Sequence, residues 1–124
     1  MIEIKFRAWC EEEKRMYHNE EIVFYCGLAY KNFTDAKNQV NYLTEIMPWT
    51  GAKDKYGKDI YLDDLILYND KIQIVRQYKS GFDYVVDTIK GAMLTPVYKN
   101  FSRLHFINLG NKFENPEIME SILK

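Results

Sequence analysis

The sequence is poor in the residues and patterns that several specialised protein classes require. Its 124 residues include only 2 cysteines and 3 prolines, which is too little cysteine for a disulfide framework and indicates a reducing compartment. The longest uncharged and mostly apolar run, residues 22–30, is far shorter than the roughly 20 residues of a membrane-spanning helix. Charges within the first seven residues do not fit a signal peptide. We therefore expect a cytoplasmic protein without a membrane partner.

Charge of either sign is not in excess. The 17 basic and 18 acidic residues give a net charge of −1, and 47% of the residues are hydrophobic. This balance excludes a strongly basic nucleic-acid coat protein and long disorder. The length suits one ordinary domain with a modest core, or at most two very small lobes.

Aromatic residues are the most informative feature that is present. They make up 15% of the chain, as 10 Tyr, 7 Phe and 2 Trp, and they alternate with Ile and Val in short runs typical of β-strands. Residues 2–9 alternate apolar and charged side chains, which predicts a strand with Ile2, Ile4, Phe6 and Ala8 on one face. Residues 16–17 are expected to return as a short antiparallel partner, which makes an N-terminal β-hairpin.

The next segments are less regular. Residues 21–30 are apolar at consecutive positions, which predicts one strand covered on both faces, with a bend at Gly27. Residues 31–40 read as a surface loop. Residues 40–47 fit either a helical stripe or a strand, and we favour the strand.

The central part of the chain has the pattern of a β-meander. Residues 53–58 predict a tight and exposed charged turn. Asn69 and Asp70 can take the positive φ values of a two-residue turn between strands at 65–68 and 71–78. A further turn leads to a strand at 82–86. Successive strands of this kind build small barrels.

The end of the chain changes from strand to helix. A last strand is expected at 104–109. Asn115 and Pro116 are an N-cap and a first helical residue, which predicts a short C-terminal helix. Its apolar stripe is expected to dock on the sheet or on another chain; the stripe consists of Ile118, Met119, Ile122 and Leu123. Nothing distinctive predicts the pairing of residues 91–102.

Three segments in order, residues 4–9, 47–66 and 108–119, resemble the YopX family of phage and prophage proteins. The resemblance implies a mainly β fold with a small SH3-like barrel core and a phage context in a bacterial host cell, and it implies no reaction. The chain departs from the family pattern in three places, one of which is the segment 91–102, where nothing distinctive remains. Cys10 stands where Asp is common, and residues 62–64 read Leu-Asp-Asp where Glu-Gly-Asp is common. Asp63 must then tolerate the turn conformation of the missing glycine.

These observations combine into one prediction of architecture. We expect a single YopX-like domain over residues 1–124. It comprises an N-terminal β region at 1–46, a barrel-like core at 47–109 and a C-terminal helix at 115–124.

Residues able to perform catalysis do not gather in the sequence. The cysteines and histidines lack metal-ligand spacing, and adjacent Asp63 and Asp64 would point to opposite faces of a strand. Cys10 follows a strand and precedes three glutamates, which disfavour a thiolate. Cys26 is expected to pack in the core and His105 to be a structural histidine within a strand. We therefore expect no enzyme, no metal site and no cofactor.

Two binding functions remain. The preferred hypothesis is an accessory protein that self-associates, or binds a phage or host protein, through β edges and aromatic surface, with a homo-oligomer expected. The alternative is a weak single-stranded nucleic-acid binder, with the site residues Trp49, Lys53, Lys55, Tyr56 and Lys58. Four aspartates among the three lysines of residues 53–64 leave no net positive field there. The sequence therefore favours a solvated turn with its tryptophan anchored in the core.

Overall fold

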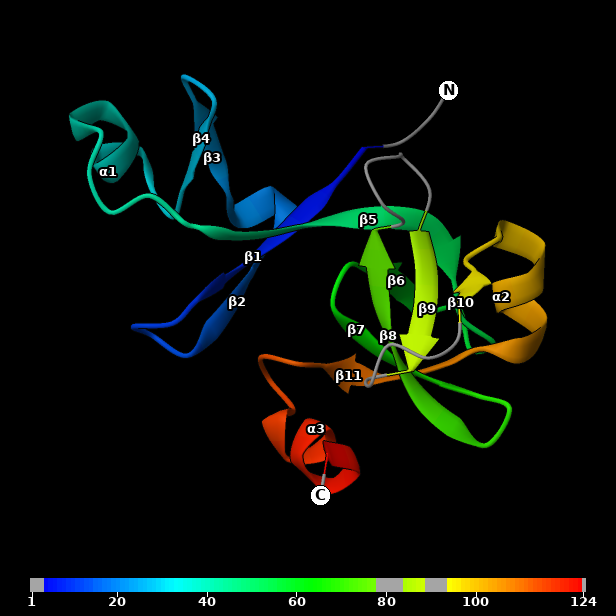
Figure 1. Cartoon of the computed structure of the whole chain (residues 1–124). Helices are drawn as coiled ribbons and strands as arrows, with labels where there is room; N and C mark the ends of the chain where they lie inside the picture. Colours follow the sequence, from blue (N-terminus) through cyan, green and yellow to red (C-terminus); the bar gives the residue numbers. More distant parts are fainter. Residues whose placement is uncertain (1–3, 78–83, 89–93, 124) are drawn as a thin grey trace. The chain divides into compact units, whose positions relative to one another are not determined.

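A computed structural model describes residues 4–77, 84–88 and 94–123 of the chain. The chain divides into two compact units, Met1–Pro48 and Trp49–Lys124, and Figure 1 gives the element labels used below. Strand β5 (Glu45–Lys53) belongs to both units, because its first residues pair with β1 and its last residues pair with β6. The two units are described separately.

The N-terminal unit is built on an antiparallel hairpin. Strand β1 (Phe6–Cys10) pairs with β2 (Arg15–His18), as predicted from residues 16–17. The strand begins only at Phe6, where pairing with β5 begins, so Ile4 is 74% exposed instead of facing the core. Ile2 lies outside the described residues. The unit's hydrophobic cluster consists of Ala8, Cys10, Tyr17, Ile22, Ala29 and Leu43.

Residues 21–30 do not form the single covered strand that was predicted. After a short 3-10 helix η1 (Asn19–Glu21), the chain makes a second hairpin from β3 (Val23–Tyr25) and β4 (Leu28–Tyr30). Cys26 and Gly27 join them with φ values of 50° and 80°, and two consecutive positive φ values close a two-residue hairpin. Cys26 is therefore exposed at the turn, and its predicted core position is wrong.

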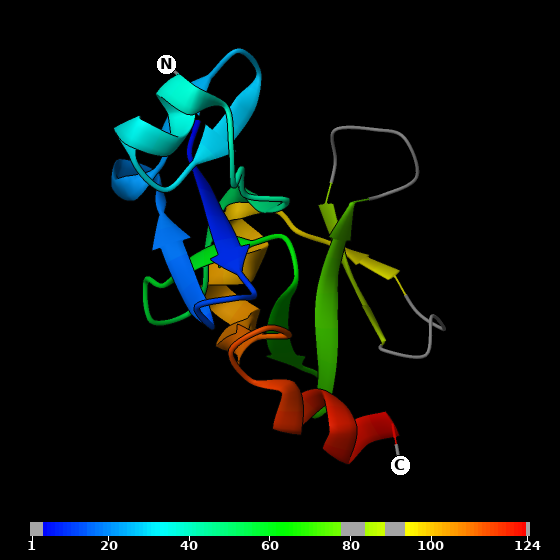
Figure 2. The ribbon, with the colours of Figure 1, turned by 90° about the vertical axis from the view of Figure 1, so that its left-hand side faces the viewer.

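The predicted loop at residues 31–40 contains a helix, α1 (Phe33–Asn38). The Asn32 side chain caps it by accepting a hydrogen bond from the Asp35 backbone N–H at 2.7 Å, as N-cap residues do. Figure 2 shows α1 beside the β3–β4 hairpin, against which it packs. The strand predicted at 40–47 forms only in part. Leu43 makes an isolated bridge to Ala29, and regular strand pairing begins in β5 at Glu45.

The C-terminal unit is a curled antiparallel sheet in the order β10-β9-β8-β7-β11. Its strands are β7 (Asp64–Tyr68), β8 (Lys71–Gln77), β9 (Tyr84–Thr88), β10 (Leu94–Pro96) and β11 (Ile107–Asn111), and β6 (Asp59–Tyr61) pairs with β5. Five fully buried side chains form the centre of its core: Ile60, Ile66, Val75, Val86 and Phe106. The prediction of a mainly β fold with a small barrel-like core, N-terminal strands and a short C-terminal helix is confirmed.

The meander follows the predicted turn chemistry. Asn69 and Asp70 have φ values of 57° and 61°, and they join β7 to β8 with Tyr68 opposite Lys71. These values match a two-residue hairpin turn that suits the twist of the strands. The turn predicted before residue 82 lies outside the described residues.

The last third of the chain holds two helices. Helix α2 (Lys99–His105) replaces the first part of the strand predicted at 104–109, so His105 is an exposed helix-terminal residue and not a strand histidine. The helical spacing places Phe101 and Ser102 toward the sheet and leaves Lys99 and Arg103 exposed. Helix α3 (Pro116–Leu123) begins at the predicted proline, and the Asn115 carbonyl accepts the Ile118 N–H at 3.1 Å.

No helix within the described ranges has the length and apolar character needed to cross a membrane.

Candidate binding groove

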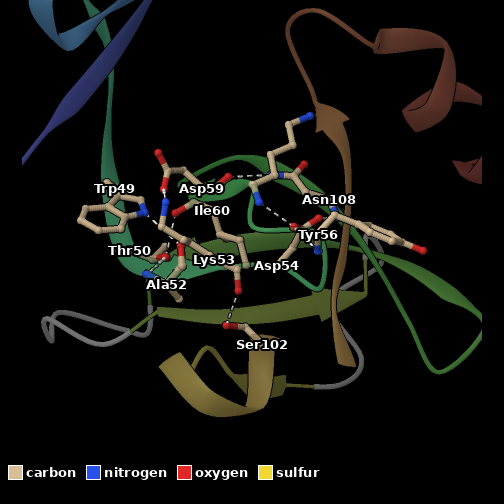
Figure 3. A network of polar contacts seen from close by, with 11 residues as sticks. Trp49, Thr50, Ala52, Lys53, Asp54, Tyr56, Asp59, Ile60, Ser102 and Asn108 are labelled. Atoms are coloured by element: carbon tan, nitrogen blue, oxygen red, sulfur yellow. Dashed lines mark hydrogen bonds and ion pairs between the residues drawn. The ribbon is translucent and has the colours of Figure 1, made fainter. Parts of the chain in front are cut away.

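The central segment of the chain is organised by the buried carboxylate of Asp54, which is 1% exposed. One carboxylate oxygen accepts the backbone N–H groups of Tyr56 and Lys58 at 2.9 and 2.8 Å. The other accepts the backbone N–H of Asn108 at 2.7 Å (Figure 3). The turn was predicted to be wholly exposed charge, but this aspartate closes it from inside and fixes it to β11.

Asp64 and Asn108 extend this network. Asp64 is 1% exposed, and one of its oxygens accepts the Tyr61 N–H at 2.7 Å and the Asn108 side-chain amide at 2.8 Å. The neighbouring Asp63 lies in the preceding turn with a φ of 71°, as its replacement of a family glycine predicted, and its carboxylate lies 3.5 Å from Lys112 Nζ. The two adjacent aspartates thus have separate structural roles.

A third polar cluster holds the start of α3. The Asn115 side chain accepts the Asn111 N–H at 3.1 Å. The Asn111 side-chain oxygen accepts the N–H groups of Phe113 and Glu114 at 3.0 and 2.8 Å. Gly110 has a φ of +136°, and a Cβ there would lie 2.1 Å from the Asn115 oxygen. The buried side chains of Asp54, Asp64, Asn108 and Asn111 therefore close turns, and their oxygens already accept hydrogen bonds.

A groove of about 480 Å³ lies in the C-terminal unit beside α2 and the second half of β5. We call it the Trp49 groove; its lining residues are Trp49, Gly51, Lys53, Lys99, Asn100 and Arg103. Its two walls are tied together by Ser102, which is fully buried and donates its hydroxyl to the Lys53 carbonyl at 2.8 Å (Figure 3). Because a buried hydrogen bond links α2 to β5, the groove is a fixed feature of this unit.

Trp49 is half-buried at the wall of this groove. Its indole N–H donates to the Ala52 carbonyl at 2.9 Å, and its backbone pairs with Tyr61. The tryptophan is therefore anchored through its polar edge, and not in the core as predicted from the sequence, and its ring lines the open groove.

Three cations lie around the tryptophan. Lys53 Nζ is 3.0 Å from a carboxylate oxygen of Asp59, so its charge is largely compensated. Lys99 and Arg103 are exposed and have no ion pair with any side chain of the described residues. Since they are four residues apart on α2, they share one helix face. Among the described residues, the groove lining holds three cations and no acid.

The sequence-predicted site residues divide into two groups. Trp49 and Lys53 line the groove. Lys55, Tyr56 and Lys58 lie in the exposed turn, where Tyr56 is 74% exposed, and none of the three lines the groove. The contributions of α2 were missed, because the Lys-x-x-x-Arg spacing has meaning only once residues 99–105 are recognised as helical.

The N-terminal unit has a smaller cavity of about 220 Å³ beside Trp9 and Cys10. Nearby, the Tyr17 hydroxyl donates to Glu13 and thereby lowers the pKa of that carboxyl, while Glu13 raises the pKa of Lys31. Neither His18 nor His105 lines this cavity or the Trp49 groove. Within the described parts of the chain, no three histidine, cysteine or carboxylate side chains gather as metal ligands would.

Comparisons with known proteins place the fold. The crystal structure of protein EF1440 from Enterococcus faecalis is similar, with a TM-score of 0.64 over 96% of this chain and 99% of that chain, at 20% sequence identity. A search of the curated proteins finds no match. The family model described as YopX protein matches residues 5–120, which include the turn-closing Asp54, Asp64 and Asn108. Since that match covers nearly the whole chain, the protein belongs to the YopX family.

Proposed function

We propose that this protein is a non-enzymatic binding protein and that its Trp49 groove binds nucleic acid through the phosphate backbone. One observation carries the proposal: α2 brings Lys99 and Arg103, which have no ion pair within the described part of the chain, to a groove that already holds Trp49 and Lys53. Basic side chains beside an aromatic ring are the elements of nucleic-acid binding by small β-folds. The phage context implied by the family resemblance belongs to this proposal.

The aspartates near the groove oppose nucleic-acid binding less than their number in the sequence suggests. The carboxylates of Asp54 and Asp64 are buried and face backbone N–H donors within the turns. Asp59 is engaged by Lys53. The local excess of positive charge therefore comes from Lys99 and Arg103, which lie outside the window of residues 53–64.

The non-enzymatic part of the proposal has its own support. The polar side chains at the centre of the C-terminal unit form hydrogen bonds with backbone groups and with each other. These side chains are Asp54, Asp64 and Asn108. A general acid or base needs to reach a substrate proton, and these groups are turned inward.

The test is the affinity of a fluorescein-labelled single-stranded oligonucleotide, followed by anisotropy at low salt. The double variant Lys99→Ala/Arg103→Ala removes two charges from the groove, and Lys55→Ala/Lys58→Ala removes two from the exposed turn of the same unit. We expect the first to weaken binding by about tenfold or more, since each phosphate contact contributes to affinity, and the second by about twofold or less. Equal losses in the two variants, or an absence of binding by the wild-type protein, would contradict the proposal.

A second candidate function, self-association, is favoured by the apolar surface of the N-terminal unit. Six large hydrophobic side chains between residues 24 and 42 are 40–80% exposed, namely Phe24, Tyr25, Leu28, Phe33, Val40 and Tyr42. Such a concentration is unusual for a surface that faces only water, and an uncharged hairpin edge such as β3 offers a site for strand pairing. We propose a second copy of the chain as the occupant, because the edge strand β3 carries no charged side chain and does not repel its own copy; a phage or host protein is the alternative occupant.

Light scattering over a wide concentration range tests this candidate. The variant Leu28→Lys/Phe33→Lys changes the N-terminal surface, and Tyr98→Lys/Leu104→Lys changes two similarly exposed apolar residues of the C-terminal unit. We expect the wild-type protein and the second variant to associate and the first to be monomeric. A wild-type protein that is monomeric throughout argues against self-association, and pull-down from induced host cells then tests for a different partner.

A further inference from the structure

We infer that the Trp49 groove takes a single strand, with one unpaired base stacked on Trp49 and the phosphates on either side of that base held by Lys99 and Arg103. The inference rests on the proposed nucleic-acid function and specifies which form of nucleic acid binds and what each residue contacts.

Trp49 is prepared to stack because its orientation is already fixed. Its indole N–H is bound to the Ala52 carbonyl at 2.9 Å, and the same strand is held to β6 by pairing of Trp49 with Tyr61. A ring held in place loses little conformational entropy on binding. Stacking of a base on such an aromatic side chain contributes about 1–3 kcal/mol and tolerates any base.

Lys99 and Arg103 are arranged to follow a phosphate backbone. They lie one turn apart on α2, so their Cβ atoms are about 6 Å apart, a separation comparable to that of neighbouring phosphates in a single strand. The anchor of α2 is Ser102, whose buried hydroxyl holds the Lys53 carbonyl of the tryptophan's own strand. The stacking ring and the two cations are therefore positioned relative to each other by one short hydrogen-bonded connection.

A duplex does not suit this arrangement. The bases of a duplex are stacked on each other, so their faces are closed to a tryptophan unless a base is extruded at a cost of a few kcal/mol. The groove volume of about 480 Å³ is typical of sites that hold a small ligand, roughly 300–1,000 Å³. It suits a base with its flanking phosphates. A duplex would leave Trp49 unused and would be held by charge alone.

Lys53 has a smaller role than its central position suggests, because Asp59 lies 3.0 Å from its ammonium group. Removing that carboxylate should free the lysine for a third phosphate. We therefore expect Asp59→Asn to raise affinity for a single strand by about two- to fivefold, and Lys53→Ala to lower it by less than either Lys99→Ala or Arg103→Ala.

The decisive experiment compares four ligands by anisotropy and by tryptophan quenching: a thymidine oligonucleotide, an abasic strand of the same length, a duplex of the same length, and thymidine monophosphate. We expect the oligonucleotide to bind at least tenfold more tightly than the other three and to quench Trp49 fluorescence. With two phosphates engaged, log K should fall with log salt with a slope of about −1.4. The variant Trp49→Phe identifies the source of quenching, and Trp49→Leu should remove most of the difference in affinity between the oligonucleotide and the abasic strand.

The outcomes distinguish a failure of base stacking on Trp49 from a failure of nucleic-acid binding itself. Equal affinity for oligonucleotide, abasic strand and duplex would overturn base stacking and leave the proposed function intact. Equal affinity for the monophosphate would replace the strand with a free nucleotide. If none of the four ligands binds, the proposed function itself fails. The abasic comparison uses the unmodified protein, so it decides the matter even where a tryptophan variant does not fold.

Discussion

The two units of the molecule differ in what they bury and in what they expose. In the C-terminal unit, the buried polar residues of the described chain include Asp54, Asp64, Ser102, Asn108 and Asn111. Arg7 is the buried polar residue that the described part of the N-terminal unit contributes. Conversely, six large hydrophobic side chains are exposed between residues 24 and 42, whereas the described part of the C-terminal unit exposes Tyr56, Tyr98 and Leu104.

The two units are specified by different kinds of interaction. Hydrogen bonds are directional, so buried acceptors such as Asp54 select one turn geometry and one position of β11. Hydrophobic contacts are not directional. The hydrophobic cluster around Tyr17 therefore does not require every apolar side chain of the N-terminal unit to be buried. One unit therefore presents a fixed groove, and the other presents an apolar surface.

The largest expected effect comes from breaking the polar network at Asp54. Asp54→Ala leaves the N–H groups of Tyr56, Lys58 and Asn108 without their buried acceptor, and we expect a loss of about 4 kcal/mol in the free energy of unfolding. Asp54→Asn keeps one acceptor oxygen and should lose about 2 kcal/mol. Urea denaturation measures both, with exposed Glu12→Ala as the control, expected to change stability by at most about 0.5 kcal/mol. A loss below about 1 kcal/mol in Asp54→Ala would remove the proposed role of the network.

Glycines with positive φ provide the next test. Gly110→Ala combines an unfavourable φ of +136° with a Cβ 2.1 Å from the Asn115 oxygen, and we expect a loss of about 3 kcal/mol. Gly57→Ala and Gly27→Ala, one in each unit, have φ values of +81° and +80° and nothing within 4 Å. Each should lose about 1 kcal/mol from backbone strain alone. Thermal unfolding compares the three, and equal losses would mean that the contact with Asn115 does not matter.

A smaller and opposite effect is expected at Asp63, the residue in the position of a family glycine. Its φ of 71° is strained for aspartate, while its ion pair with Lys112 at 3.5 Å lies near the surface and contributes little. Asp63→Gly should therefore stabilise the protein by about 0.5 kcal/mol. The variant Lys112→Ala removes the ion pair alone and should have almost no effect. Destabilisation by Asp63→Gly would show that the ion pair outweighs the strain.

The smallest expected effect distinguishes two tyrosines, one in each unit. The hydrogen bond from the Tyr17 hydroxyl to Glu13 raises the pKa of Tyr17, whereas burial raises the pKa of Tyr84. Both contribute stability below the ordinary value of 10.0 that is lost as pH rises further, because the unfolded tyrosine ionises first. Glu13→Gln should return the pKa of Tyr17 toward its ordinary value and leave that of Tyr84 unchanged, as NMR titration of labelled tyrosine can measure. A shift of Tyr84 as well would point to a global change.

The same hydrogen bond lowers the pKa of Glu13. It contributes stability above the ordinary value of 4.5, and that stability is lost as pH falls through the lower pKa of the folded state. Glu13→Gln should therefore make stability less dependent on pH in the acid range.

Local chemistry made parts of the fold predictable from the sequence. The turn at Asn69-Asp70 and the helix start at Asn115-Pro116 were predicted correctly, because these residue types favour those backbone conformations by themselves. Cys26-Gly27 lies within an apolar run, where a single strand and a hairpin have the same composition, and the run was misread. Helix α1 was missed because its cap, Asn32, was interpreted as a loop residue.

Only the β5 side of the candidate groove could be predicted from the sequence. Trp49 and Lys53 were identified from their neighbours in sequence, because aromatic and basic residues alternate there. Lys99 and Arg103 come from a helix about fifty residues later, and the Ser102 bond to the Lys53 carbonyl that brings α2 beside the tryptophan is a tertiary contact. No local pattern encodes that contact, so the charge balance of residues 53–64 pointed away from the nucleic-acid hypothesis.

The most direct test of the groove as the binding site is a titration of ¹⁵N-labelled protein with a thymidine oligonucleotide, followed by NMR. The two tryptophans give one indole N–H signal each, and Trp9, which is 5% exposed in the N-terminal unit, is an internal control. Binding in the groove predicts that the Trp49 indole and the backbone amides of Lys99–Arg103 shift with increasing oligonucleotide while the Trp9 indole signal stays in place. Shifts confined to the turn at residues 55–58 or to the N-terminal unit would contradict it.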